Sequence, residues 1–150
     1  MGLVVQKFGG SSLKDADSLR EAARKAVRAK HAGNGVIVVV SAQGSTTDDL
    51  IAKAAEITAT PSAREMDMLL ATGEQISIAL TALAIQELGE SAVSFTGPQV
   101  GIVTDSTHRK ARIKKIDTQR VRDALETGNI VVLAGFQGMD ELGDLSLIHI

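Results

Sequence analysis

A lysine near the end of an apolar run, with the glycines that follow it, is the feature of this chain best suited to chemistry. Residues 3–8 form a short apolar run that stops at Gly9 and Gly10, and two serines come next. Glycines let backbone N–H groups approach an anion closely, and hydroxyls add donors without charge. Lys7 could neutralise a phosphate held in this loop. The pattern therefore predicts a phosphate site, with an ordinary strand-to-helix turn and a solvated lysine as an equally weighted alternative.

Two other apolar runs also end in segments of small residues. Residues 36–40 lead into Ser-Ala-Gln-Gly-Ser-Thr-Thr at 41–47, and residues 130–134 lead into Gly-Phe-Gln-Gly at 135–138. Ligands of open parallel sheets bind beyond the carboxyl ends of the strands, so we expect these segments to converge. Neither standard nucleotide fingerprint is present, because no segment has P-loop spacing and Gly33 and Gly35 precede their strand.

Short β-branched runs alternate with helical patterns, which predicts an α/β fold with a mainly parallel sheet. The runs at 36–40 and 130–134 are apolar on both faces, so helices should cover the sheet above and below in a three-layer α/β/α sandwich. Ser18 and Glu21 fit a capping box at the start of one helix. We expect helices at 18–31, 50–57, 62–70, 74–88 and 118–127, strands at 3–8, 36–40, 92–96 and 130–134, and an exposed hairpin at 112–116.

The composition excludes several classes of protein. The 150 residues include no cysteine, so there is no disulfide framework and no thiolate metal site. The net charge is −2 and the only aromatic residues are three Phe, so the chain has neither the basic surface nor the stacking side chains typical of nucleic-acid binding. We found no signal peptide and no apolar run near the ~18 residues of a membrane span, so we expect a cytoplasmic protein without membrane contact. His31, His108 and His149 have no partners at metal-ligand spacing, so no metal site is expected.

Residues 4–13, Val-Val-Gln-Lys-Phe-Gly-Gly-Ser-Ser-Leu, resemble the N-terminal signature of the aspartate kinases, within the amino-acid kinase superfamily. The resemblance continues in the family's order to about residue 144, and the bacterial single-function type is most similar. Its further blocks are 38–42, 46–48, 63–70, 73–77, 94–97 and 134–138. It implies the amino-acid kinase fold, which is carbamate kinase-like.

The resemblance also implies a reaction, in which ATP with Mg²⁺ phosphorylates the β-carboxylate of L-aspartate at the first step of Lys, Thr and Met biosynthesis. A carboxylate is ionised at pH 7 and needs no general base, so cationic donors that bring two anions together fit this chemistry. The resemblance assigns the ATP phosphates to Lys7, Phe8, Gly9, Gly10 and Ser41, with Lys7 also stabilising the transferring group. It assigns aspartate to Ser12, Thr46, Thr47 and Glu74, with Glu74 as the counter-ion of the α-ammonium.

Each assignment has a structural alternative. Glu74 could simply begin a helix after Gly73, where the dipole stabilises a carboxylate by ~0.3–1 kcal/mol. Residues 46–48 could be a helix cap. Arg64, Glu65 and Asp67 are interpreted as surface or subunit-contact charges.

The resemblance stops after Gly138, where the family continues into a glycine-arginine motif whose Arg would pair with the substrate carboxylate. We therefore interpret residues 1–144 as the N-terminal part of a truncated amino-acid kinase domain. Residues 145–150 are interpreted as a non-native or truncated tail, or else an edge strand. Positioning supplies most of this catalysis, so we expect the fragment alone to be inactive. The full-length parent is expected to be a homo- or hetero-oligomer. Another amino-acid kinase, acting on glutamate or acetylglutamate, and a non-catalytic binding or dimerisation module remain as alternatives.

Overall fold

The main sheet of the protein is parallel and carries the three strand exits described above. The computed structural model describes residues 2–148. Four strands, in the order β1-β2-β6-β3, make the sheet: β1 (Leu3–Phe8), β2 (Gly35–Val40), β6 (Ile130–Ala134) and β3 (Ala92–Phe95). All neighbouring pairs are parallel. Their carboxyl ends therefore meet at one edge, as the sequence predicts.

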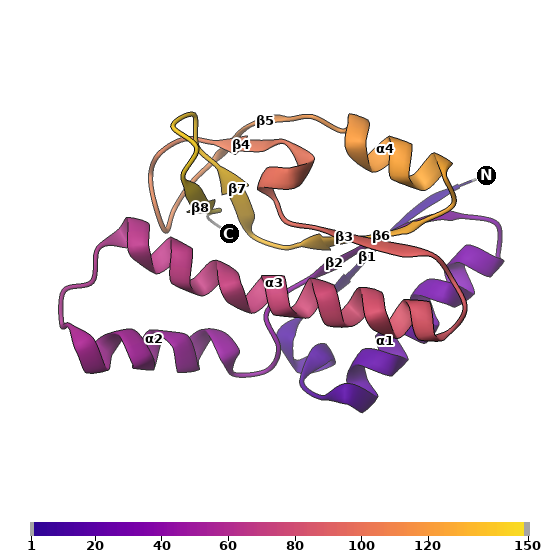
Figure 1. Ribbon diagram of the computed structural model, residues 1–150, viewed down its shortest axis with the longest axis horizontal. Coiled ribbons are helices and arrows are strands. Elements are labelled where there is room, and N and C mark those ends of the chain that lie inside the picture. The colour runs from indigo at the N-terminus through magenta and orange to yellow at the C-terminus, as the bar shows by residue number, and fades with distance from the viewer. Residues whose placement is uncertain (1, 149–150) are drawn as a thin grey trace.

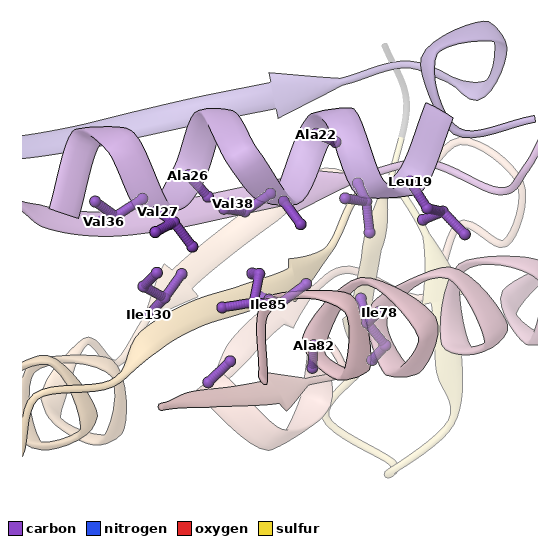
Figure 2. Packing of buried hydrophobic residues seen from close by; sticks show 14 of the residues in the cluster. Leu19, Ala22, Ala26, Val27, Val36, Val38, Ile78, Ala82, Ile85 and Ile130 are labelled. Atoms are coloured by element: carbon purple, nitrogen blue, oxygen red, sulfur yellow. The ribbon is translucent and has the colours of Figure 1, made fainter. Parts of the chain in front are cut away.

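Helices cover both faces of this sheet, so the predicted three-layer α/β/α sandwich with a mainly parallel sheet is confirmed. On one face lie α1 (Ala16–His31) and α3 (Ala63–Glu87), and on the other lies α4 (Gln119–Glu126) (Figure 1). Val36 and Val38 of β2 and Ile130 of β6 are buried in one cluster with residues of both helices, among them Val27 of α1 and Ile85 of α3 (Figure 2). Burial of each such side chain contributes ~1.5–3 kcal/mol, which explains why these runs have no polar alternation.

The opposite face of the sheet has a second, smaller core beneath α4. Val131 of β6 and Phe95 of β3 are buried there, and Val121 and Leu125 of α4 pack against them. Alternate residues of β6 therefore face different helices, as expected for a strand inside a three-layer sandwich.

A second, mostly antiparallel sheet lies beside the first and was only partly expected. Its strands, in the order β5-β4-β7-β8, are β5 (Ile113–Ile116), β4 (Ile102–Thr104), β7 (Gln137–Met139) and β8 (Leu145–Leu147). The hairpin expected at 112–116 is wrong in its extent, because Ile113–Ile116 form the single exposed strand β5, whose antiparallel partner is β4. Residues 145–147 pair with β7 as the edge strand β8, whereas the last two residues of the expected tail lie outside the described residues.

Helix boundaries differ from the sequence prediction most clearly at Ser18 and at Gly73. The capping box at Ser18 is wrong, because α1 begins earlier and Asp15 caps it by accepting the Ser18 N–H at 2.8 Å. The break at Gly73 is also wrong, because α3 runs through it. A Cβ on Gly73 would lie 2.9 Å from the Cβ of Ala42, so this glycine serves close packing rather than helix termination.

The sequence predicts no segment long and apolar enough to span a membrane, and helix α3 is an exception by length and composition. By length and composition this 25-residue helix could cross a membrane, although half of its most apolar window is buried within the structure. Its buried face packs against β2, β3 and β6, as in any core helix of a globular fold. The remaining helix, α2 (Thr46–Ile57), packs alongside α3, and two short 3₁₀ turns lie at Gly10–Leu13 and Pro98–Val100.

Candidate active site

A cavity of about 370 Å³ lies at the carboxyl ends of β1, β2 and β6. Its walls come from all three predicted strand exits, from α3 and from the loop before β5. They comprise Gly10, Ser41, Ala42, Gly44, Thr47, Leu70, Glu74, Arg109, Phe136, Leu147 and Ile148. A larger hollow of about 520 Å³ between α2 and α3 has mainly apolar walls. Because the three strand exits and the buried carboxyl group of Glu74 meet in the smaller cavity, we place the candidate site there.

The backbone of two loops forms one wall of this cavity. The Gly44 N–H donates to the Gly10 carbonyl at 2.9 Å, and a Cβ on Gly10 would lie 2.8 Å from the carbonyl oxygen of Ala42. Because Gly10 has no side chain, the loop at residues 9–13 can lie directly against the loop at residues 41–45. This close approach is what a backbone phosphate cradle requires.

We expect Gly10→Ala to destabilise the chain by about 1–3 kcal/mol, because the new methyl group would push against backbone atoms rather than a flexible side chain. Gly9→Ala is the matched control: Gly9 has a φ of −79° and nothing within 4 Å of an added Cβ. Urea unfolding followed by circular dichroism measures both variants. Equal stability of the two alanine variants would contradict the close approach of the loops.

The ammonium group of Lys7 lies at the edge of the cavity. Its Nζ is 4.9 Å from the ring centroid of Phe136, which lines the cavity and has an unusual φ of +60°. Within residues 2–148 no carboxylate pairs with Lys7. The cation is therefore held by a cation–π contact and is available to an incoming anion.

Glu74 supplies a carboxyl group in the wall of the cavity. The residue is only 6% exposed, and its Oε2 has no hydrogen-bond partner. Burial raises the pKa of Glu74 to about 7, and hydrogen bonds from Gln137 and the Ala42 backbone offset this only in part. Because Glu74 lies in the middle of α3, its alternative role at a helix N-terminus is wrong. A buried carboxyl group with one oxygen free of hydrogen bonds can bind a cationic group of a ligand at this position.

The other predicted residues are divided between this cavity and its surroundings. Ser41 and Thr47 line the cavity. Thr46 instead faces Gly73, with its Cγ2 3.3 Å from where a Cβ would stand. Neither threonine is the cap of α2, because the helix begins at Thr46 and its N-cap is Ser45. Phe8 and Ser12 line a separate small hollow beside α1, and Gly9 immediately precedes the 3₁₀ turn.

The sequence predicts a surface or subunit-contact charge at Asp67, and this is wrong because the residue is fully buried within the chain. Its Oδ2 accepts hydrogen bonds from His108 Nδ1 and from the Leu147 N–H, both at 3.0 Å, and its Oδ1 accepts from the Arg109 N–H at 3.1 Å. Its partners lie 41, 42 and 80 residues downstream, so no local pattern could have identified this role. Arg64 and Glu65, interpreted in the same way, do lie on the surface.

Two histidines have acidic partners that the sequence spacing did not show. His31 Nε2 lies 2.6 Å from Glu90 Oε1, and ligand atoms of His108, Asp140 and Asp144 lie within 4.8 Å of one another. Asp144 is already paired with Arg64, and His108 with Asp67. These contacts describe an ion-pair network that joins α3 to the second sheet. His149 lies outside the described residues.

Mg²⁺, which the resemblance implies, has no dedicated ligand set in the cavity. Magnesium prefers carboxylates, waters and substrate phosphates. Among residues 2–148 the wall has one carboxyl group, that of Glu74, and its raised pKa disfavours metal ligation at neutral pH. The residues of the cavity therefore do not fit a resident Mg²⁺ site.

Sequence comparison gives the class of protein to which this parallel sheet and glycine-lined site belong. Residues 2–149 match the amino acid kinase family, and the chain belongs to it. The chain is 54% identical over 141 residues to the aspartokinase of Mycolicibacterium smegmatis, covering 94% of this chain and 34% of that protein. It is equally similar to aspartokinase 2 of Bacillus subtilis, covering 94% of this chain and 35% of the relative.

A solved structure agrees with the sequence relatives. The crystal structure of aspartate kinase from Synechocystis superimposes with a TM-score of 0.80 at 42% identity, covering 98% of this chain and 24% of that one. The chain thus spans about a third of the length of the curated relatives described above.

Proposed function

We propose that this chain forms the amino-acid side of an aspartate kinase site, in which ATP phosphorylates the β-carboxylate of L-aspartate. The observation that carries the proposal is the pairing, in one cavity, of a desolvated carboxyl group at Glu74 with a cation at Lys7 held at the cavity's edge. Glu74 fits the α-ammonium of an amino acid. Lys7, with the Gly9 and Gly10 backbone, fits anionic groups. Relatives named aspartokinase support the choice of aspartate over glutamate or acetylglutamate.

In the proposed reaction a β-carboxylate oxygen attacks the γ-phosphorus of ATP, the bond from that phosphorus to the β–γ bridging oxygen breaks, and ADP leaves. The nucleophile is already ionised, so no residue needs to remove a proton. Lys7 reduces the repulsion between the two anions, with Ser41 and the glycine loop beside the phosphates. Thr47 belongs to the proposed aspartate side with Glu74, whereas Phe8, Ser12 and Thr46 are not part of the cavity wall. Mg²⁺ would enter on the ATP phosphates and neutralise their charge.

Lys7→Ala tests this assignment on the 150-residue chain. We expect the variant to stay folded and to bind ADP about 10–100-fold more weakly than the wild type, because a charge-assisted contact to phosphate is lost. Titration calorimetry measures the affinity. Lys53→Ala, which removes an exposed lysine of α2, is the control and should leave the affinity unchanged. Unaltered ADP binding by Lys7→Ala would contradict the phosphate role.

The surroundings of the site bear on assembly and location. Ile76, Leu80 and Leu83 form an exposed apolar stripe on α3, which supports the proposal that the parent protein is an oligomer.

We also propose a cytoplasmic location, because the proposed reaction consumes ATP. Because positioning of both substrates supplies most of the catalysis, the 150-residue chain by itself is proposed to bind ligands without turning them over.

A further inference from the structure

We propose that His108, Asp140 and Asp144 form a binding site for one divalent transition-metal ion, with Zn²⁺ as the best match. Ligand atoms of the three side chains lie within 4.8 Å of one another. His108 belongs to the loop between β4 and β5, and the two aspartates belong to the turn between β7 and β8. A bound ion would therefore join two loops of the second sheet. None of the three residues is part of the wall of the candidate active site, so the metal site is independent of the proposed kinase reaction.

Asp140 is the residue that points most clearly to a ligand. It is only 2% exposed, and its Oδ2 has no hydrogen-bond partner among residues 2–148. Its Oδ1, in contrast, accepts from the N–H groups of Leu142 and Asp144 at 3.0 and 2.9 Å, which fixes the orientation of the carboxylate. A buried carboxylate oxygen without a partner is costly, and a bound cation would satisfy it.

His108 faces this oxygen with its second ring nitrogen. Its Nδ1 lies 3.0 Å from Oδ2 of the fully buried Asp67, whereas its Nε2 lies 3.8 Å from Oδ2 of Asp140. The second separation is too long for a hydrogen bond, but two ligands of one Zn²⁺, each ~2.0–2.2 Å from the ion, lie ~3.4–4.4 Å apart. Metal-bound histidines usually donate their other ring N–H to a carboxylate. Asp67 provides that acceptor, because it favours the proton on Nδ1 and leaves the Nε2 lone pair for a metal.

Asp144 supplies the third ligand and is the one with room to move. Its Oδ1 lies 2.7 Å from the guanidinium of Arg64, and since a carboxylate has two oxygens, this pairing leaves Oδ2 for a metal. Its side chain is 28% exposed, so it can close on an ion held by the other two ligands. The carboxylates of Asp67, Asp140 and Asp144 outnumber the cation of Arg64 by two charges when His108 is neutral. A divalent ion would balance this excess.

The types of ligand select the kind of ion. One imidazole and two carboxylates match Zn²⁺, which binds nitrogen and oxygen in a tetrahedron whose fourth position a water can fill. Mg²⁺ instead prefers an octahedron of oxygen ligands, so an imidazole disfavours it. The proposed ion is therefore different from the Mg²⁺ that would enter with ATP.

Zinc binding by the metal-free 150-residue chain tests the proposal. By competition with a chromophoric chelator, we expect one Zn²⁺ per chain and no comparable binding of Mg²⁺. At a free Zn²⁺ concentration about 100 times Kd, the melting temperature should rise by about 5 °C or more, because only the folded chain has the site. In ¹H–¹⁵N spectra of the histidine rings, Zn²⁺ should shift Nε2 of His108 and leave its Nδ1 protonated.

Asp140→Asn removes the charged ligand with the least change to the turn. Its amide oxygen can still accept from Leu142 and Asp144, so without metal we expect it to melt within about 3 °C of the wild type. It should bind Zn²⁺ at least about tenfold more weakly. His31→Gln is the matched control, because His31 also contacts a carboxylate, that of Glu90 at 2.6 Å, but on the surface. This control should leave the zinc affinity unchanged.

Equal zinc affinity of the wild type and Asp140→Asn would overturn the proposal, as would a wild type that binds no Zn²⁺ or binds Mg²⁺ as tightly. A His108 ring that stays protonated at both nitrogens when Zn²⁺ is added would overturn it as well. That result would show that a proton, and not a metal ion, bridges Asp67 and Asp140. The spectrum of the wild type decides between the two even if the variant does not fold.

Discussion

Replacement of Asp67 by alanine is expected to destabilise the chain by about 3–5 kcal/mol, because a fully buried carboxylate and all its hydrogen bonds would be lost. The N–H groups of Arg109 and Leu147 and the ring of His108 would remain without their acceptor. Those partners belong to the 105–112 loop and to β8, so the loss should loosen the second sheet from α3. Urea unfolding followed by circular dichroism measures the effect.

Asp17→Ala is the matched control for this prediction. Asp17 lies in the first turn of α1, where its side chain is 94% exposed and paired only with Arg20. Loss of an exposed ion pair costs at most about 1 kcal/mol. A destabilisation by Asp67→Ala no larger than that of the control would show that Asp67 does not hold the two parts together.

Glu74→Gln is expected to stabilise the empty chain at alkaline pH and to abolish aspartate binding. The pKa of Glu74 rises from 4.5 to about 7 on folding because the carboxyl group is buried. Between these values the folded chain holds a proton that the unfolded chain has released, so the contribution of Glu74 to stability falls as the pH rises. The difference amounts to at most about 3 kcal/mol above pH 7 and vanishes below pH 4.5.

Unfolding free energies of wild type and Glu74→Gln, measured from about pH 5 to pH 8.5, test this directly. The advantage of the glutamine variant should grow across that range. Glu56→Gln, on the exposed side of α2, should remain within about 0.5 kcal/mol of the wild type. A glutamine variant that is less stable than the wild type at pH 8.5 would contradict the account in which burial disfavours the ionised carboxyl group of Glu74. A Glu74→Gln variant that is more stable than the wild type but no longer binds aspartate would show the stability–function trade-off that is common at binding sites.

The parallel sheet and half of the site could be predicted from sequence because their signals are local. The β-branched run of β2 has no polar alternation, and this alone requires helices on both faces. Likewise, Gly9 and Gly10 follow the strand that carries Lys7, so these residues had to lie at the carboxyl edge of the sheet. Glu74 could be assigned a substrate role only through the resemblance to aspartate kinases.

The rest of the site depends on contacts between distant segments. Asp67 appears in the sequence as one more charge on a helix, and only the fold brings His108 and Arg109 to it. The continuity of α3 through Gly73 was missed for a similar reason. The space that this glycine leaves is filled by Ala42 from another loop, so its role is one of packing that no local signal reports.

The most direct test of the central claim, that Glu74 receives the α-ammonium of aspartate, is the proton released on binding. Calorimetric titrations of the 150-residue chain with L-aspartate at pH 7, in phosphate and in Tris, give the number of protons exchanged. With a pKa of about 7 the carboxyl group of the empty site is about half protonated, and an ammonium beside it favours the ionised form. We predict release of about half a proton per aspartate bound by the wild type. Binding with no proton release, or no binding at all, would contradict the account.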